Sequence, residues 1–201
     1  MKVFFGASFT QDEWTKQNLP LLDYHVVEEI ASKKLTFRTI DKIIIPSLLY
    51  YNIGHAPLLS KAQEIYIQSR DWNNVHFIGV RQKDVKYIVS ENNISKIKMI
   101  DDEITPIAPG IIAHRAPTGS FGHMFLTVAT KRGWILLGGD VMFTQSWYKL
   151  LQVHFPEVHR KVEMVAEMYD IKDKRYLIPS HDVEVAEKGF RTISEGIYLV
   201  E

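Results

Sequence analysis

The sequence predicts an α+β fold in which two β-sheets carry helices on their outer faces. Three observations support this prediction. Helical and strand patterns are mixed along the 201 residues, strand patterns dominate the middle third, and short polar turns separate the strands there. Because a centre of this kind pairs largely antiparallel, two sheets with helices outside are favoured over a strictly alternating βαβ sheet.

In the N-terminal half, helical and strand patterns follow one another closely. Residues 22–34 carry apolar side chains at helical spacing and predict a helix. Residues 41–46 predict a short buried strand that a proline stops. A helical stretch over residues 56–64 precedes a second β-branched run at residues 65–67.

The middle of the chain is rich in strand patterns, and the C-terminal part mixes both types. Strands are predicted at residues 85–89, 94–100, 104–107, 111–114, 123–130 and 134–137. An amphipathic helix is predicted at residues 157–169, followed by a strand at residues 176–179. No linker-like segment interrupts the series, so we expect a single domain over residues 1–201.

Composition limits the classes of function. Lysine plus arginine equals aspartate plus glutamate, 24 each, so no overall field attracts nucleic acid or an anionic membrane. The absence of cysteine removes thiolate metal sites and cysteine nucleophiles, and fits a reducing compartment. No signal peptide and no apolar run of about 20 residues is found. We therefore expect a cytoplasmic protein that binds neither nucleic acid nor membrane.

Polar residues follow three of the predicted strands, at Ser47, Asp140 and His181. Loops at strand ends are where functional side chains usually gather. Taken singly, an aspartate after Gly-Gly or a histidine in Pro-Ser-His-Asp is more often a turn residue. The aromatic residues from Phe143 to Trp147 are interpreted as core, with the mouth of a pocket as the alternative.

Four motifs taken in order are more informative than any one of them. They are DKIIIPSLLYYNIGHAPLL with Gly54, then APTGSFGH, WILLGGDVMFT and IPSHD. This series resembles the metallo-β-lactamase superfamily, most closely its lactonase-like and glyoxalase-II-like members, from about Val26 to His181. The resemblance implies a four-layer αββα sandwich.

The resemblance also implies metal ligands at positions that here carry other residue types. In the first motif these positions hold Ser47, Leu49, Tyr51 and Asn52, and in the second the ligand position holds Gly119. Asp140, at the position of the bridging carboxylate, and His181 keep their ligand types. His123 corresponds to a histidine that packs and hydrogen-bonds in the family.

Too few ligands remain for the metal chemistry of the fold. Catalytic zinc normally takes three protein ligands, and Asp140 and His181 supply two. We therefore predict that no cofactor is bound and that the dinuclear zinc site is lost. A weak mononuclear site for zinc or another divalent metal, completed by His55 or His114, is the alternative.

Without a metal, the Asp140 carboxylate needs hydrogen-bond donors, because an unpartnered buried carboxylate is costly. Tyr51 and Asn52 are predicted to supply these donors, and His181 to form an ion pair with the carboxylate. The predicted pocket thus combines Asp140 and His181, as catalytic residues or remnant metal ligands, with further polar positions. These pocket positions are Ser47, Tyr51, Asn52, His55, Gly119, His123 and Asp182.

About forty residues precede the first motif, fewer than the several strands that the resemblance implies. Residues 2–7 correspond to the last of those strands, and we expect an N-terminally shortened fold. Missing strands would expose a sheet edge or apolar surface. A homodimer could cover that surface. Alternatively, the true start codon lies further upstream and the protein is longer.

The leading functional hypothesis is a degenerate member of the superfamily that acts as a binding or assembly protein, or that keeps residual activity. The alternative is a hydrolase of a small ester, lactone or thioester. It would use one metal, or a metal-free site in which Asp140 or Asp182 orients His181 as the general base. A third hypothesis is a structural subunit paired with a metal-retaining homologue. The ligand is not specified, since fold does not determine function.

Overall fold

The computed structural model describes residues 3–5, 41–49, 52, 62–74, 94–180, 182, 190–194 and 197–199. The chain divides into two compact units, Met1–Asp101 and Asp102–Glu201, which are described one at a time. The predicted helix at 22–34, most of the helical stretch at 56–64 and the predicted strand at 85–89 lie outside the described residues. The single domain over residues 1–201 stays a prediction.

The first unit contains a four-stranded sheet whose strand order is β1-β2-β3-β4. The strands are β1 (Val3–Phe5), β2 (Lys42–Ile44), β3 (Glu64–Gln68) and β4 (Ile97–Ile100). All three pairings are parallel. The strands predicted at 41–46 and 65–67 are confirmed, whereas the one predicted at 94–100 begins later, because residue 94 is helical and residues 95–96 form a turn.

Burial in the first unit explains why its strands read as continuous apolar runs. Ile43, Ile45, Ile65 and Ile67 share one hydrophobic cluster, while Ile44, between them in β2, is also fully buried. Parallel strands buried on both faces show this pattern rather than strict alternation. The expectation of mainly antiparallel pairing therefore holds only for the second unit.

The second unit contains a five-stranded sheet of order β5-β6-β7-β8-β9. Its strands are β5 (Ile104–Ala108), β6 (Ile111–Arg115), β7 (Met124–Thr130), β8 (Gly133–Leu137) and β9 (Leu177–Ile178). The first four pair antiparallel, and β9 lies parallel to β8. Each of these strands was predicted, although β9 is shorter because residues 174–176 form a 3₁₀ turn, η4.

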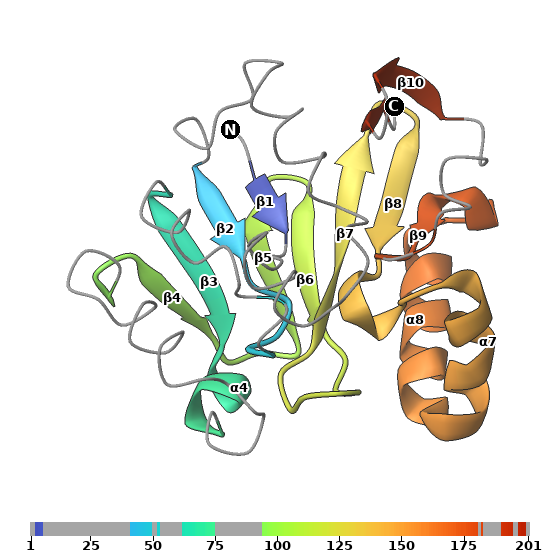
Figure 1. Cartoon of the computed structure of the whole chain (residues 1–201). Helices are drawn as coiled ribbons and strands as arrows, with labels where there is room; N and C mark the ends of the chain where they lie inside the picture. Colours follow the sequence, from blue (N-terminus) through green and yellow to red (C-terminus); the bar gives the residue numbers. More distant parts are fainter. Residues whose placement is uncertain are drawn as a thin grey trace, which may run out of the picture. The chain divides into compact units, whose positions relative to one another are not determined.

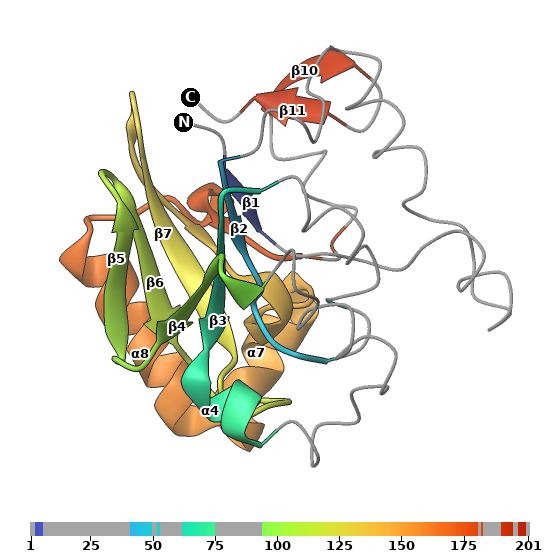
Figure 2. The same ribbon diagram turned by 90° about the vertical axis from the view of Figure 1, so that its left-hand side faces the viewer.

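Two helices, α7 (Gln145–His154) and α8 (Pro156–Met168), lie side by side against one face of this sheet (Figures 1 and 2). Their buried side chains form one cluster with Phe125 of β7 and Leu136 of β8. The helix predicted at 157–169 is confirmed as α8. Neither α7 nor the antiparallel pair β10 (Arg191–Ser194) and β11 (Ile197–Leu199) was predicted.

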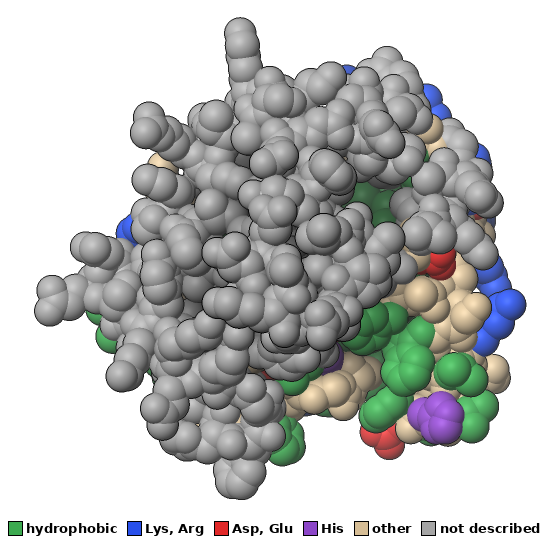
Figure 3. Space-filling view, viewed as in Figure 1, with side chains coloured by type: hydrophobic (Ala, Val, Ile, Leu, Met, Phe, Trp, Pro, Cys, Tyr) green, Lys and Arg blue, Asp and Glu red, His purple; other side chains and the backbone are tan. Residues whose placement is uncertain are grey.

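The surface of the α7–α8 hairpin carries apolar side chains (Figure 3). The exposed members are Leu150, Val153, Met164 and Met168. Among the helices in the described parts of the chain, none is long and apolar enough to cross a membrane.

Candidate functional site

The loop that follows β8 places Asp140, and two glycines shape this loop. A Cβ atom on Gly138 would lie 2.4 Å from the Cβ of Met142, so only glycine allows this close approach. Gly139 has a φ of 51°, in the left-handed region that favours glycine. A short 3₁₀ turn, η3 (Gly139–Val141), then carries Asp140. The sequence Gly-Gly-Asp is thus explained by the shape of the turn.

The Asp140 side chain is buried, with 3% of its surface exposed. The Ser180 hydroxyl donates a hydrogen bond to its Oδ1 at 3.3 Å. Two backbone bonds join the segments that carry these residues: Gly138 N–H donates to the Ile178 carbonyl at 2.8 Å, and Ser180 N–H to the Met142 carbonyl at 3.0 Å. The parallel pairing of β8 with β9 therefore brings the Gly-Gly-Asp and Pro-Ser-His-Asp segments together. His181 itself lies outside the described residues.

Asp182 has a structural partner at the start of α7. Its Oδ2 accepts a hydrogen bond from the Gln145 N–H at 2.8 Å, which satisfies one of the unpaired donors at the helix N-terminus. The Thr144 hydroxyl accepts from the Trp147 N–H at 3.0 Å and caps the same turn. Because His181 lies outside the described residues, its orientation by Asp182 or Asp140 stays a prediction.

His123 holds the loop that carries Gly119. Its Nδ1 accepts a hydrogen bond from the Gly119 N–H at 3.1 Å and lies 2.7 Å from the Thr118 hydroxyl. Since Nδ1 accepts, the neutral ring carries its proton on Nε2. Nε2 is buried and has no partner among the described residues. Burial lowers the pKa of His123 to about 4, so the ring is neutral at pH 7.

His114 lies on the helix-bearing face of the second sheet. Its Nε2 is 2.9 Å from the Thr127 hydroxyl, and its ring stacks on Phe125 with centroids 4.9 Å apart. Burial, and to a smaller extent the nearby Lys161 ammonium, lower the pKa of His114 to about 4. Among the described residues, the side chains in contact with the His114 ring are those of Thr127, Phe125 and Tyr169, none of which is a carboxylate. The structure therefore gives no support to His114 as a recruited metal ligand.

In the first unit, side-chain hydrogen bonds hold the loop after β2. The Asn52 amide donates to the Ser47 hydroxyl at 2.7 Å, with both residues more than nine-tenths buried. Leu49 packs against the apolar cluster of the sheet. The Leu48 N–H donates to the buried Asp71 carboxylate at 3.0 Å, which fixes the backbone of this loop. Tyr51 and His55 lie outside the described residues.

The residues at these positions do not fit a dinuclear zinc centre. Such a centre needs imidazoles and carboxylates, whereas the described positions hold a hydroxyl, an alkyl group, an amide and, at Gly119, no side chain. Within the described ranges, no group of three or more histidine, aspartate or glutamate side chains is placed to hold an ion. A mononuclear site that includes His181 stays a prediction.

Comparison with solved structures identifies the fold. An N-acyl homoserine lactone hydrolase, solved with N-hexanoyl-L-homoserine at its catalytic metal centre, is 16% identical, with a TM-score of 0.69 over 98% of this chain and 82% of that one. A Staphylococcus aureus protein described as a metal-dependent hydrolase is 17% identical, with a TM-score of 0.64 over 90% of this chain and 70% of that one. A Thermotoga maritima protein assigned to the metallo-β-lactamases is 12% identical, with a TM-score of 0.60 over 90% and 80%. The chain has the metallo-β-lactamase fold. No family model matches the sequence, and no curated protein matches it.

Some site residues of this metallo-β-lactamase-fold chain were not found from the sequence. Ser180 donates to Asp140 and Asp71 fixes the loop after β2, and neither was predicted. Ser180 stands next to His181 in the IPSHD motif, so its position near the site could be predicted. Its hydrogen bond to Asp140 could not. Asp71 carries no such signal, because its partner is 23 residues away in the sequence.

Proposed function

We propose that this chain is a metallo-β-lactamase-fold protein without a dinuclear zinc centre that binds a small molecule at the loops after β8 and β9. The observation that carries the proposal is the buried hydrogen bond between Ser47 and Asn52. These side chains occupy two of the positions that the sequence resemblance assigns to metal ligands, and they satisfy each other. Leu49, at a third such position, contributes to the apolar core instead.

Asp140 is the polar centre of the proposed binding site. A carboxylate buried to this degree is stable when hydrogen-bond donors surround it, and the Ser180 hydroxyl is one of them. The glycine-shaped turn and the two backbone bonds to the β9 segment hold this pair in place. A preorganised carboxylate and hydroxyl suit a ligand with N–H or O–H donors.

The second candidate is a hydrolase of a small ester, lactone or thioester. It is favoured by solved structures of the same fold that are lactone hydrolases. In its metal-free form, His181 would take a proton from water and Asp140 would orient the imidazole. In its metal-bound form, an ion on Asp140 and His181 would lower the pKa of a bound water.

Elemental analysis of the undenatured protein, combined with turnover of small esters, lactones and thioesters, separates the two candidates. We expect no stoichiometric transition metal and no turnover above the rate measured in buffer alone. Any shift of the melting temperature that these compounds cause in the parent protein should be lost in Asp140→Asn. The asparagine can still accept the hydrogen bond from the Ser180 hydroxyl. His154→Gln, an exposed change on α7, is the control. Stoichiometric metal, or turnover abolished by both Asp140→Asn and His181→Ala, would establish the hydrolase instead.

Self-association of the chain stays a prediction. Light scattering of the purified protein at several concentrations would determine its mass. The same measurement with candidate partners would test the hypothesis of a structural subunit.

A further inference from the structure

A hollow on the surface of the second unit lies apart from the candidate site. It encloses about 410 Å³ between the β7–β8 turn and the segment that follows α8. Small-molecule sites typically measure roughly 300–1,000 Å³. Trp134, which lines the hollow, lies at the start of β8, whereas Asp140 follows the end of that strand. The hollow and the candidate site are thus at opposite ends of β8.

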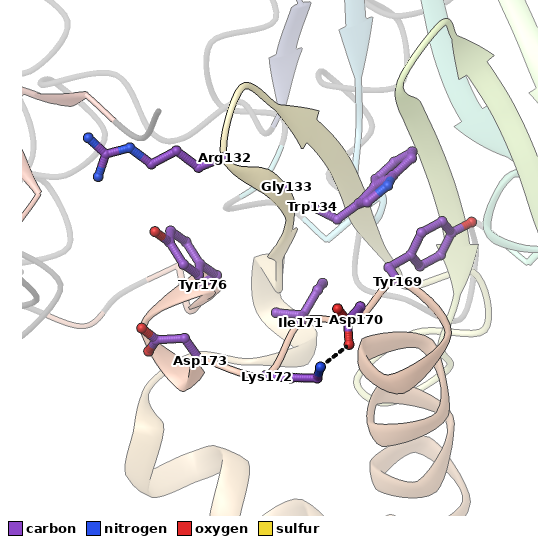
Figure 4. A pocket seen from close by; sticks show the side chains of 9 residues that line it. All are labelled: Arg132, Gly133, Trp134, Tyr169, Asp170, Ile171, Lys172, Asp173 and Tyr176. Atoms are coloured by element: carbon purple, nitrogen blue, oxygen red, sulfur yellow. Dashed lines mark ion pairs between the residues drawn. The ribbon is translucent and has the colours of Figure 1, made fainter.

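Aromatic side chains stand on two sides of this hollow. Figure 4 shows Tyr176 on one side and Trp134 with Tyr169 on the other. The rings of Trp134 and Tyr169 pack together, with centroids 4.5 Å apart and planes inclined by 45°. Ile171, which is 9% exposed, lies between the two sides. These aromatic residues and Ile171 give the hollow an apolar part that a ring can contact.

The backbone around the hollow is fixed by the end of α8. Asp170 has a φ of 55°, a conformation that glycine or asparagine usually supplies after a helix. The Ile171 N–H donates to the Ala166 carbonyl at 2.8 Å, and the Asp170 N–H to the Glu167 carbonyl at 3.0 Å. These bonds close the helix and hold Tyr169 to Ile171 in one conformation. The hollow is therefore largely preformed.

Four charged side chains line the hollow: Arg132, Asp170, Lys172 and Asp173. Asp170 and Lys172 form an ion pair of 2.9 Å, with 75% and 84% of their side-chain surfaces exposed. Exposed ion pairs are worth little, so a ligand with both charges can replace each partner. Asp173, by contrast, already accepts hydrogen bonds from the Arg175 backbone and guanidinium. Asp170 and Lys172 thus offer a ligand a carboxylate and an ammonium about 3 Å apart.

We propose that this hollow binds a free α-amino acid with an aromatic side chain. The ring lies between Tyr176 and the Trp134–Tyr169 pair, over Ile171. The ammonium group of the ligand meets Asp170, and its carboxylate meets Lys172. A ligand with only one of these charges would make one of the two charge contacts and would therefore bind more weakly.

Calorimetric or NMR titration with three compounds that share one ring tests this assignment. L-Phenylalanine carries both charges, 3-phenylpropionate only the carboxylate, and 2-phenylethylamine only the ammonium group. For about 12 non-hydrogen atoms in an open site, we expect L-phenylalanine to bind with a dissociation constant on the order of 1 mM. The other two compounds should bind at least about fivefold more weakly. Equal binding of all three, or no saturable binding of L-phenylalanine, would overturn the proposal.

Variants of the full chain locate the bound ligand. Lys172→Ala and Tyr176→Leu should each weaken L-phenylalanine binding by about fivefold or more. Lys174→Ala is the matched control, because Lys174 is an exposed cation of the same segment that does not line the hollow. An equal loss in the control, or no loss in either lining variant, would contradict the assigned site.

Discussion

At Gly138, an added Cβ would lie 2.4 Å from the Cβ and 3.0 Å from the Cγ of Met142, which is fully buried. Because Met142 belongs to the core between the sheet and the helices, it has little room to move. We expect Gly138→Ala to lower the free energy of unfolding by about 1–3 kcal/mol, the usual cost of overpacking. Urea unfolding measures this change.

A double-mutant cycle tests the cause of that loss. Met142→Ala removes the Cγ and Sδ atoms that the new methyl group would meet but keeps the Cβ, which is the nearest atom at 2.4 Å. Without the long side chain, residue 142 has more room to shift, so Gly138→Ala should cost less in a Met142→Ala background than in the parent protein. An unchanged cost would show that the contact with the Cγ and Sδ atoms does not contribute to the loss.

Which residue types stand at the site could be predicted from the sequence, but which side chains pair with one another could not. Ser47, Leu49 and Gly119 can be seen from the sequence alone to differ from the ligand types that the resemblance implies. The pairing of Ser47 with Asn52 cannot, because it depends on how the backbone turns between them. The same holds for Ser180 and Asp140, which lie 40 residues apart and meet through the pairing of β8 with β9.

At the scale of elements, the β7–β8 hairpin could be predicted from two apolar runs on either side of a polar turn, and the helix α8 from apolar residues at helical spacing. The helix α7 was missed because its apolar residues fall on two faces. Tyr148 and Leu151 are buried, while Leu150 and Val153 are exposed. The parallel sheet of the first unit was missed because its crossover connections, not its strand patterns, determine the direction of pairing.

The start of α7 depends on two side chains that lie outside the helix. Thr144 accepts from the Trp147 N–H, and Asp182 accepts from the Gln145 N–H. We expect Thr144→Ala to lower the free energy of unfolding by about 1 kcal/mol and Asp182→Asn by about 0.3–1 kcal/mol. Ser146→Ala, an exposed change in the same turn, should stay within about 0.5 kcal/mol. Denaturant titrations of the three variants make the comparison, and equal effects would contradict the capping roles.

At the scale of the whole molecule, the fold is identified, whereas the absence of a metal-ligand set stays a prediction. Solved structures at 16% identity cover 98% of the chain, although most of the ligand positions expected from the sequence hold other residue types. The apolar strand and helix patterns determine the fold, and they do not require the polar loops that a metal needs. The sequence therefore predicted the fold class better than it predicted the arrangement of the site.

Two buried histidines of the second unit make its stability depend on pH. The pKa values of His114 and His123 are both lowered from 6.5 to about 4, mainly by burial. As the pH falls, these two histidines therefore take up protons near pH 6.5 in the unfolded chain, whereas in the folded chain they stay neutral until about pH 4. Stability is complete above that pH and falls as the pH drops toward 4. At about pH 5, we expect a loss of about 2 kcal/mol for each histidine relative to pH 7.5.

Urea unfolding at about pH 7.5 and pH 5 measures this loss of stability. A single substitution shows how much of it is due to His114. In His114→Gln the loss should fall by about half, because one of the two groups no longer titrates. His154→Gln should leave it unchanged, since His154 is exposed on α7. The lowered pKa values of Glu64 and Glu103 act mainly below this window, where carboxylates take up protons. A pH dependence that is the same in His114→Gln and the parent protein would show that the buried ring does not stay neutral in the folded chain.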